Sequence, residues 1–263
     1  MKHKWLAILL FLSIAFFGGC GAETTQNSED VWVIAEEISY NENGDATIRN
    51  VYEYQENQYN YRRANYEGER TPYYTEVTQS KDGKARTEKT YRDDTWITTL
   101  EQRYDKDGRI LSEILTRFDG EEDKTEWKWS KNNTVAQKYI DGILVATEEY
   151  DEQGRKVYSI DNESETEIIY TEQERILRAS FLDGSQSFYV VNKYDEQNRV
   201  IEIYNYTVNG AASYSEEDMT AYSVITYDED EHSYWVKAEY NDGEVQMKSS
   251  MHVIYKPLSE MLK

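Results

Sequence analysis

The chain has 263 residues, with 51 Asp and Glu against 29 Lys and Arg, 24 Tyr, 6 Trp and 2 Pro. Its net charge of -22 excludes nucleic acid and anionic lipid headgroups as partners, because phosphate would repel so acidic a protein. The many aromatic residues argue against disorder, and the modest apolar content predicts a thin core built from tyrosine rings. Two explanations of the charge stay open, namely solubility and a cationic partner or divalent ions.

The first residues predict export. Lys2, His3 and Lys4 form a short basic segment, and the apolar run from residue 5 to 17 is too short to span a bilayer comfortably. The following Phe-Gly-Gly-Cys, which ends at Cys20, resembles the lipobox of bacterial lipoproteins. Since Cys20 is the only cysteine, it cannot form an internal disulfide. The alternative is an ordinary secretory signal followed by an incidental cysteine.

The lipobox resemblance implies that residues 1–19 are removed and that Cys20 carries the lipid. The protein would then be held by its N-terminal lipid at the extracytoplasmic face of the cell membrane, because two acyl chains suffice for a stable anchor. Loss of Lys2 and Lys4 leaves 27 basic against 51 acidic side chains, a net charge near -24. Residues 20–30 are small and polar and predict a flexible tether.

Residues 31–257 predict one all-β repeat domain, followed by a tail at 258–263. Apolar and polar residues alternate between turn signals, as at residues 125–130, where Trp127 and Trp129 share one face. Asp-Gly and Asn-Gly pairs supply the positive φ that tight hairpins need. Turns spaced by about ten to fifteen residues indicate an antiparallel β-hairpin array of about fifteen to eighteen strands, in an extended meander or a partial spiral sheet. A short helical turn is predicted at residues 215–218.

A longer corner motif reads Tyr-Asp-x-x-(Gly/Asn)-Arg and occurs at residues 104–109, 150–155 and 194–199, with a degenerate copy at 170–175. The Asp can cap the turn, and Gly or Asn takes the left-handed position. We expect the Arg stem to lie along the preceding Tyr. These corners resemble the YD repeat of the Rhs and teneurin families, in which tandem copies build a spiralling β-sheet shell. The copies here are too few to imply the encapsulating role of those families.

No motif in the sequence predicts catalysis, a cofactor or a metal. Aligning Gly108 with the glycine of a calcium loop puts Arg103 and Ile114 where acids are required. The acidic run at residues 228–231 reads as a solvated loop or a weak cation site. His232 and His252 lack ligand spacing, and no serine elbow is present. A pair of catalytic carboxylates would be hidden among so many acids.

The sequence therefore predicts a non-catalytic surface scaffold or protein-interaction module. The partner is an unknown protein or glycan. In the carbohydrate-binding alternative, Trp127 and Trp129 would stack on sugar rings. The same two residues would instead pack the thin core if they are structural.

Overall fold

The computed structural model describes residues 31–67, 70–130, 132–210, 213–241 and 246–262, and Val31–Lys263 form one compact unit. The unit contains eighteen strands, a 3-10 helix η2 and a short helix α2. In chain order they are β1 (Trp32–Tyr40), β2 (Ala46–Gln55), β3 (Asn57–Glu67), β4 (Arg70–Gln79), β5 (Ala85–Arg92), β6 (Thr95–Tyr104), β7 (Ile110–Arg117), β8 (Glu122–Trp129), β9 (Val135–Ile140), β10 (Ile143–Tyr150), β11 (Lys156–Asp161), β12 (Ser164–Tyr170), β13 (Glu174–Phe181), β14 (Gln186–Tyr194), β15 (Val200–Asn209), η2 (Glu216–Asp218), β16 (Met219–Tyr227), β17 (Tyr234–Asn241), β18 (Gln246–Pro257) and α2 (Leu258–Met261).

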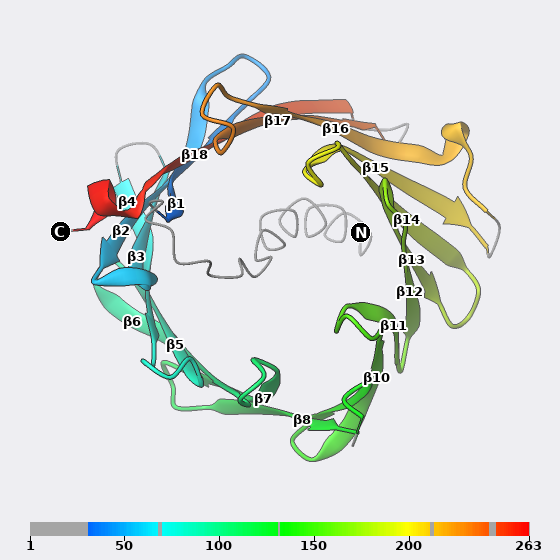
Figure 1. Cartoon of the computed structure of the whole chain (residues 1–263), viewed down its shortest axis with the longest axis horizontal. Helices are drawn as coiled ribbons and strands as arrows, with labels where there is room; N and C mark the ends of the chain where they lie inside the picture. Colours follow the sequence, from blue (N-terminus) through cyan, green and yellow to red (C-terminus); the bar gives the residue numbers. More distant parts are fainter. Residues whose placement is uncertain (1–30, 68–69, 131, 211–212, 242–245, 263) are drawn as a thin grey trace. The chain divides into compact units, whose positions relative to one another are not determined.

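The strands form a closed barrel (Figure 1). Each strand pairs antiparallel with the next, and β1 pairs with β18 as well as with β2, so that Trp32 lies opposite Pro257 and Tyr40 opposite Ser250. The prediction of an all-β antiparallel meander is confirmed. The sheet is nevertheless closed, whereas we expected an extended or partly spiral sheet. Eighteen strands enclose a wider interior than the eight-stranded barrels that side chains can fill.

Repeated bulges give a physical reason for the closure. The register shifts at Tyr40, Tyr104, Tyr150 and Tyr194, each at the end of a strand that leads into a turn. A bulge bends its strand and increases the local twist. Because these bulges recur around the sheet, their bends add up and help to curve the sheet into a closed ring. This overall curvature cannot be predicted from each turn taken separately.

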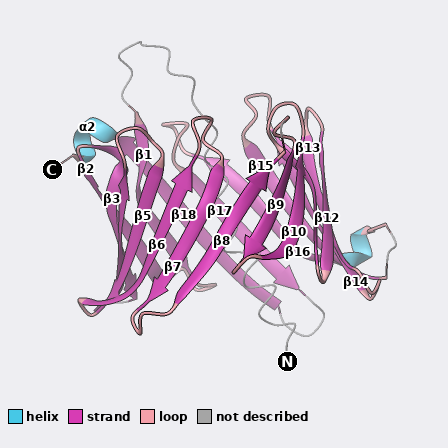
Figure 2. Cartoon of the chain, turned by 90° about the horizontal axis from the view of Figure 1, so that it is seen from below, coloured by secondary structure: helices cyan, strands magenta, loops and turns pink. Residues whose placement is uncertain are grey.

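Turns connect the strands at both rims of the barrel (Figure 2). In an antiparallel meander, all turns that follow even-numbered strands lie at one rim, here called the corner rim. The three Tyr-Asp-x-x-(Gly/Asn)-Arg corners follow β6, β10 and β14, and so all lie there. The Asp-Gly turns at residues 119–120, 141–142 and 183–184 follow odd-numbered strands and lie at the opposite rim.

The corners have the predicted local geometry. The Asp105 carboxylate accepts hydrogen bonds from the backbone N–H groups of Asp107 at 2.8 Å and Arg109 at 3.0 Å, and from the Arg109 side-chain Nε at 2.7 Å. Asp151 and Asp195 make the same three bonds within their own corners. The left-handed position has φ values of 77°, 76° and 61° at Gly108, Gly154 and Asn198. The capping and left-handed roles are therefore present as expected.

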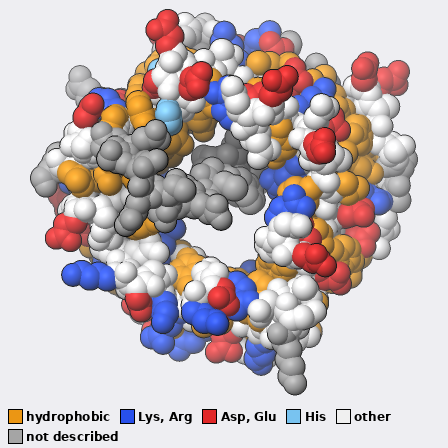
Figure 3. All heavy atoms as spheres, viewed as in Figure 1, with side chains coloured by type: hydrophobic (Ala, Val, Ile, Leu, Met, Phe, Trp, Pro, Cys, Tyr) orange, Lys and Arg blue, Asp and Glu red, His pale blue; other side chains and the backbone are white. Residues whose placement is uncertain are grey.

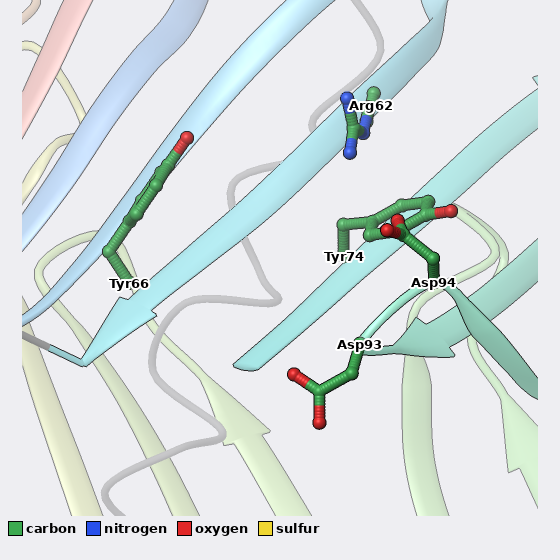
Figure 4. Close-up of a pocket in the computed structure, with 5 residues that line it drawn as sticks. All are labelled: Arg62, Tyr66, Tyr74, Asp93 and Asp94. Carbon is green, nitrogen blue, oxygen red and sulfur yellow. The ribbon is translucent and has the colours of Figure 1, made fainter. Parts of the chain in front are cut away.

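The two faces of the wall are distinguished by burial and by Figure 4, in which the far side of the ring lies behind β3 and β4 and the pocket residues are seen from outside. Arg62 and Tyr74 lie on this outer face. The alternate residues Arg63 and Thr75 lie on the inner face, which carries most of the buried side chains because they converge on the concave side. Cross-strand pairs extend the inner face around the ring, through Arg63, Thr75, Thr90, Thr98 and Arg117 and then Trp129, Ala136, Glu148, Ser159, Thr166, Ala179 and Phe188.

The buried apolar side chains form a thin layer along the wall. One compact cluster joins Val33, Tyr52 and Tyr54, and Leu258 and Met261 of α2 pack against it. The Tyr52 hydroxyl donates to the Glu37 carboxylate at 2.9 Å, and the residue Glu37 is only 8% exposed. Tyrosine rings thus supply much of the packing in this cluster, with their hydroxyls bonded to buried acceptors.

Candidate functional site

Each corner is locked to the next hairpin by its arginine. The guanidinium of Arg155 lies over the ring of Tyr170 at 4.2 Å, and that of Arg199 over the ring of Tyr227 at 4.2 Å. Each of these tyrosines ends the second strand beyond the corner, so the guanidinium meets a later Tyr than the preceding one along which we expected the Arg stem to lie. The reason is geometric, because the Asp of the corner holds Nε and turns the guanidinium toward the neighbouring hairpin.

Trp129 occupies the same structural position at the first corner. Arg109 lies 5.5 Å from its ring, and its indole N–H donates to the carbonyl oxygen of Ile110 at 2.9 Å. The hydroxyls of Tyr170 and Tyr227 donate to the equivalent carbonyls of Lys156 and Val200, at 3.2 Å and 3.3 Å. The Tyr150 ring also contacts Trp129, with 4.9 Å between the centroids. Trp129 is therefore a bracing residue of the corner rim.

Trp127 and Trp129 share one face of their strand, as the alternation predicted, and cross-strand pairing places that face on the inside of the barrel. Trp127 is opposite Lys138, whose Nζ lies 5.5 Å from the Trp127 ring. The two tryptophans lie on the same strand, β8, but their rings contact different residues.

A cluster of five tyrosines lies on the outer face of β14–β16 and in the loop before η2; we call Tyr189, Tyr204, Tyr206, Tyr214 and Tyr222 the tyrosine patch. The Tyr214 ring is 4.3 Å from that of Tyr206 and 4.8 Å from that of Tyr189. The Tyr204 ring is 4.8 Å from that of Tyr222 and 6.4 Å from that of Tyr206. Because Phe188 and its cross-strand partner Thr207 face inward, Tyr189 and Tyr206 face outward. The rings form one continuous aromatic surface.

Glu202 fixes one end of the tyrosine patch. Its carboxylate accepts hydrogen bonds from the hydroxyls of Tyr204 at 2.9 Å and Tyr222 at 3.1 Å, and Lys193 Nζ lies 3.5 Å from it. The bond from Tyr204 is the main cause that lowers the pKa of Glu202. Burial, with the bond to Glu202, raises the pKa of Tyr222 to about 12. At neutral pH the phenols are protonated donors held by an ionised carboxylate.

A second feature of the outer face is a pocket of about 410 Å³, lined by Arg62 and Tyr66 of β3, Tyr74 of β4, and Asp93 and Asp94 of the β5–β6 turn (Figure 4). The Arg62 guanidinium lies 4.1 Å above the centre of the Tyr74 ring. Tyr74 in turn stacks on Tyr91, with 4.6 Å between centroids and 10° between planes. Three side chains from three adjacent strands thus form a rigid stack beside the pocket.

The acidic turn at this pocket is unusual. Asp93 and Asp94 have φ values of 48° and 63°, the left-handed pair that a two-residue hairpin requires. At the comparable turn Asp141-Gly142, glycine takes the second position with φ 80°. A non-glycine residue in this conformation costs about 1–2 kcal/mol.

The remaining predicted positions fall into two groups. Cys20, the signal segment 1–19 and the tether 20–30 lie outside the described residues. In the acidic loop, Asp228 Oδ2 lies 2.7 Å from His252 Nε2, and the His252 ring stacks on Trp235 at 4.2 Å. Within the part of the chain that is described, no three His, Cys, Asp or Glu side chains come together as a metal site. The same ranges contain no helix long and apolar enough to cross a membrane.

Sequence reasoning missed both the tyrosine patch and the pocket. Residues 202, 204 and 206 alternate on one face and could have indicated an aromatic stripe on that strand. The contribution of Tyr214, and the meeting of Arg62 with a turn about thirty residues away, depend on pairing register and could not be found by scanning for motifs.

No family model matches this chain, and no curated protein matches it. Among solved structures, a porin-like protein from Bacteroides uniformis aligns with 8% identity and a TM-score of 0.45, covering 85% of this chain and 98% of that chain. MucB in complex with MucA aligns with 9% identity and a TM-score of 0.13, covering 88% of this chain and 90% of that chain. With TM-scores this low, we base no argument on either structure.

Proposed function

We propose that this protein is a lipid-anchored, extracytoplasmic β-barrel that acts without catalysis as a surface interaction module. The tyrosine patch carries the proposal. Tyr is enriched at protein interfaces because it offers a large amphipathic contact area at low cost in side-chain entropy. Acids flank the patch, since Glu174 and Glu216 lie close enough to Tyr206 to raise its pKa, after the larger effect of burial. The proposed partner is a protein with an apolar centre and a basic margin.

The outer wall supports a barrel surrounded by water. Glu122, Lys124, Glu126 and Lys128 form an exposed row along the outer face of β8. A lysine facing lipid at the bilayer midplane would cost about 2–4 kcal/mol. Seen along the barrel axis, acidic and basic side chains surround the ring and its middle is hollowed (Figure 3). The proposed attachment is therefore the lipid on Cys20, with the barrel outside the bilayer.

We also propose that the corners are one internal repeat, as their resemblance to the YD repeat implies. The repeated unit is a hairpin whose arginine braces the next hairpin. Carbohydrate binding by Trp127 and Trp129 has weaker support, because Arg109 and Tyr150 contact the Trp129 ring and Ile110 accepts from its indole N–H.

Photo-crosslinking in intact cells tests the interaction module. A benzophenone amino acid would replace Tyr206 or Tyr214 in the full-length lipoprotein, with Tyr139 on the outer face of β9 as the matched control position. We expect a defined crosslinked protein from the two patch positions and none from Tyr139, and loss of the product when the other patch tyrosine is changed to Ser. Equal crosslinking from all three positions would refute the role of the patch.

A further inference from the structure

The outer pocket beside β3 and β4 presents opposite charges that do not neutralise each other. Arg62 on one side, and Asp93 and Asp94 on the other, form no ion pair with any residue in the described ranges. Glu76 lies directly across the β3–β4 ladder from Arg62, yet no ion pair joins them either.

The Arg62 side chain is fixed in position, but it lacks hydrogen-bond partners. Stacking on Tyr74 fixes the plane of the guanidinium. The end of that plane, which carries the two Nη groups and is here called the free edge, forms no ion pair or hydrogen bond with a described residue. Its Nε is buried and has no hydrogen-bond partner. A buried donor without a partner costs about 1–3 kcal/mol, and the Nε groups of Arg86 and Arg178, away from the pocket, share this feature.

The acidic side of the pocket has an unfavourable backbone conformation. Asp94 occupies a left-handed position that glycine fills in the turn at residues 141–142, and the strain persists at the pocket. In Figure 4 the Asp94 carboxylate lies toward Tyr74, whereas that of Asp93 is turned away from the ring. Asp94 is therefore the main carboxylate available to a ligand that also reaches Arg62.

We infer that this pocket binds a small zwitterion. Its anionic end, a carboxylate or phosphate, would take the free edge of Arg62, which suits two-pronged recognition of such groups. Its cationic end would take Asp94 and, more weakly, Asp93. The phenols of Tyr66 and Tyr74 line the space between. The volume of about 410 Å³ lies within the range of small-molecule sites. This inference is independent of the tyrosine patch.

Calorimetric titration of the full-length mature protein tests the pocket. The probes are glycylglycine and phosphocholine as zwitterions, acetate and methylammonium as single-charge fragments, and glucose as a neutral polyol. We expect a dissociation constant on the order of 1 mM or tighter for at least one zwitterion, and binding at least about tenfold weaker for both fragments and for glucose. Glucose binding without zwitterion binding would overturn the inference in favour of a saccharide site.

Matched variants locate the binding. Arg62→Gln and Asp94→Asn should each weaken zwitterion binding by about tenfold or more, and Asp93→Asn by less. The controls are Arg49→Gln, whose arginine pairs with Glu36 at 2.9 Å on the neighbouring strand, and Asp141→Asn in the comparable turn. Asn tolerates the left-handed conformation, so Asp94→Asn should fold and melt at or above the wild-type temperature. Equal loss in the control variants would refute the site.

Patch variants separate this inference from the proposed function. With the benzophenone amino acid at Tyr206, Tyr214→Ser should abolish the crosslinked product, and Tyr214→Ser in the otherwise unaltered protein should leave zwitterion affinity unchanged. Loss of zwitterion binding in Tyr214→Ser would show that the pocket is not the binding site.

Discussion

At the residue scale, each corner aspartate both caps its turn and forms an ion pair with the arginine of the same corner. Asp195 caps its turn through two backbone N–H groups and also pairs with Arg199 at 2.9 Å. Burial opposes ionisation of Asp195, yet the bonds from Arg199 and Gln197 outweigh it, and its pKa lies below the usual range. In the turn at residues 41–45, Asn41 caps the same kind of turn with bonds to Asn43 and Asp45 at 3.0 Å and 2.9 Å. Capping therefore does not need a charge.

This difference predicts a pH dependence. A carboxylate whose pKa is lower in the folded state stabilises the protein fully above the unfolded pKa of about 3.9, and the effect is lost as the pH falls through the folded pKa. Asp195→Asn should retain the cap and cost about 1 kcal/mol of unfolding free energy at pH 7, and less at pH 3, below the unfolded pKa. Urea unfolding at the two pH values would measure this. An equal cost at both pH values would show that the ion pair contributes nothing.

At the element scale, the aromatic residue two strands beyond each corner is a brace. Trp129, Tyr170 and Tyr227 each meet an arginine and bond a carbonyl of the strand that follows the corner. Trp127, on the same strand and face as Trp129, contacts Lys138 but has no such bond among the described contacts.

The two tryptophans should therefore differ in their effect on stability. We expect Trp129→Ala to lower the unfolding free energy by about 3 kcal/mol, through lost packing and a carbonyl left without its donor. Trp127→Ala should cost about 1 kcal/mol. Equilibrium urea unfolding of the two variants would compare them, with Tyr170→Ala as the positive control. A larger loss from Trp127→Ala would contradict the bracing role.

The elements themselves were accessible from the sequence, because period-two alternation and Asp-Gly turns mark strands and hairpins locally. The corner cap was equally readable, since Asp105 bonds residues two and four positions away. The arginine contacts could not be predicted from the sequence. Arg155 reaches Tyr170 across a hairpin, and only the pairing register of that hairpin shows that the two residues meet. The pocket and the tyrosine patch could not be predicted for the same reason, since each is formed by side chains from three or more segments.

At the scale of the whole molecule, closure changes the meaning of the acidic charge. Solubility was one of the two explanations of the charge, and in an open sheet acidic residues would also protect exposed strand edges from aggregation. Each of the eighteen strands of the described barrel has a neighbour on both sides, so no edge remains there to protect. Acidic clusters instead occupy turns, at residues 93–94, 216–218 and 228–231. This distribution is consistent with a partner that meets the rims or the flanks of the patch through basic side chains.

The proposed lipid anchor on Cys20 is tested at this scale too. Changing Cys20 to Ser should release the protein from the membrane fraction into the soluble extracytoplasmic fraction, because without the acyl chains no lipid holds it. Fractionation with metabolic palmitate labelling would check this, with wild type labelled and the variant unlabelled. A variant that stays in the membrane fraction would require another attachment.

The pairing of Trp32 with Pro257 has one more consequence. The first and last strands, β1 and β18, are hydrogen-bonded neighbours. The two ends of the barrel are therefore adjacent in space although they are far apart in the sequence. A covalent link between these positions and a new break at any two-residue hairpin would yield a circular permutant with every ladder intact. The ladder of hydrogen bonds in the barrel therefore does not depend on which hairpin carries the chain ends.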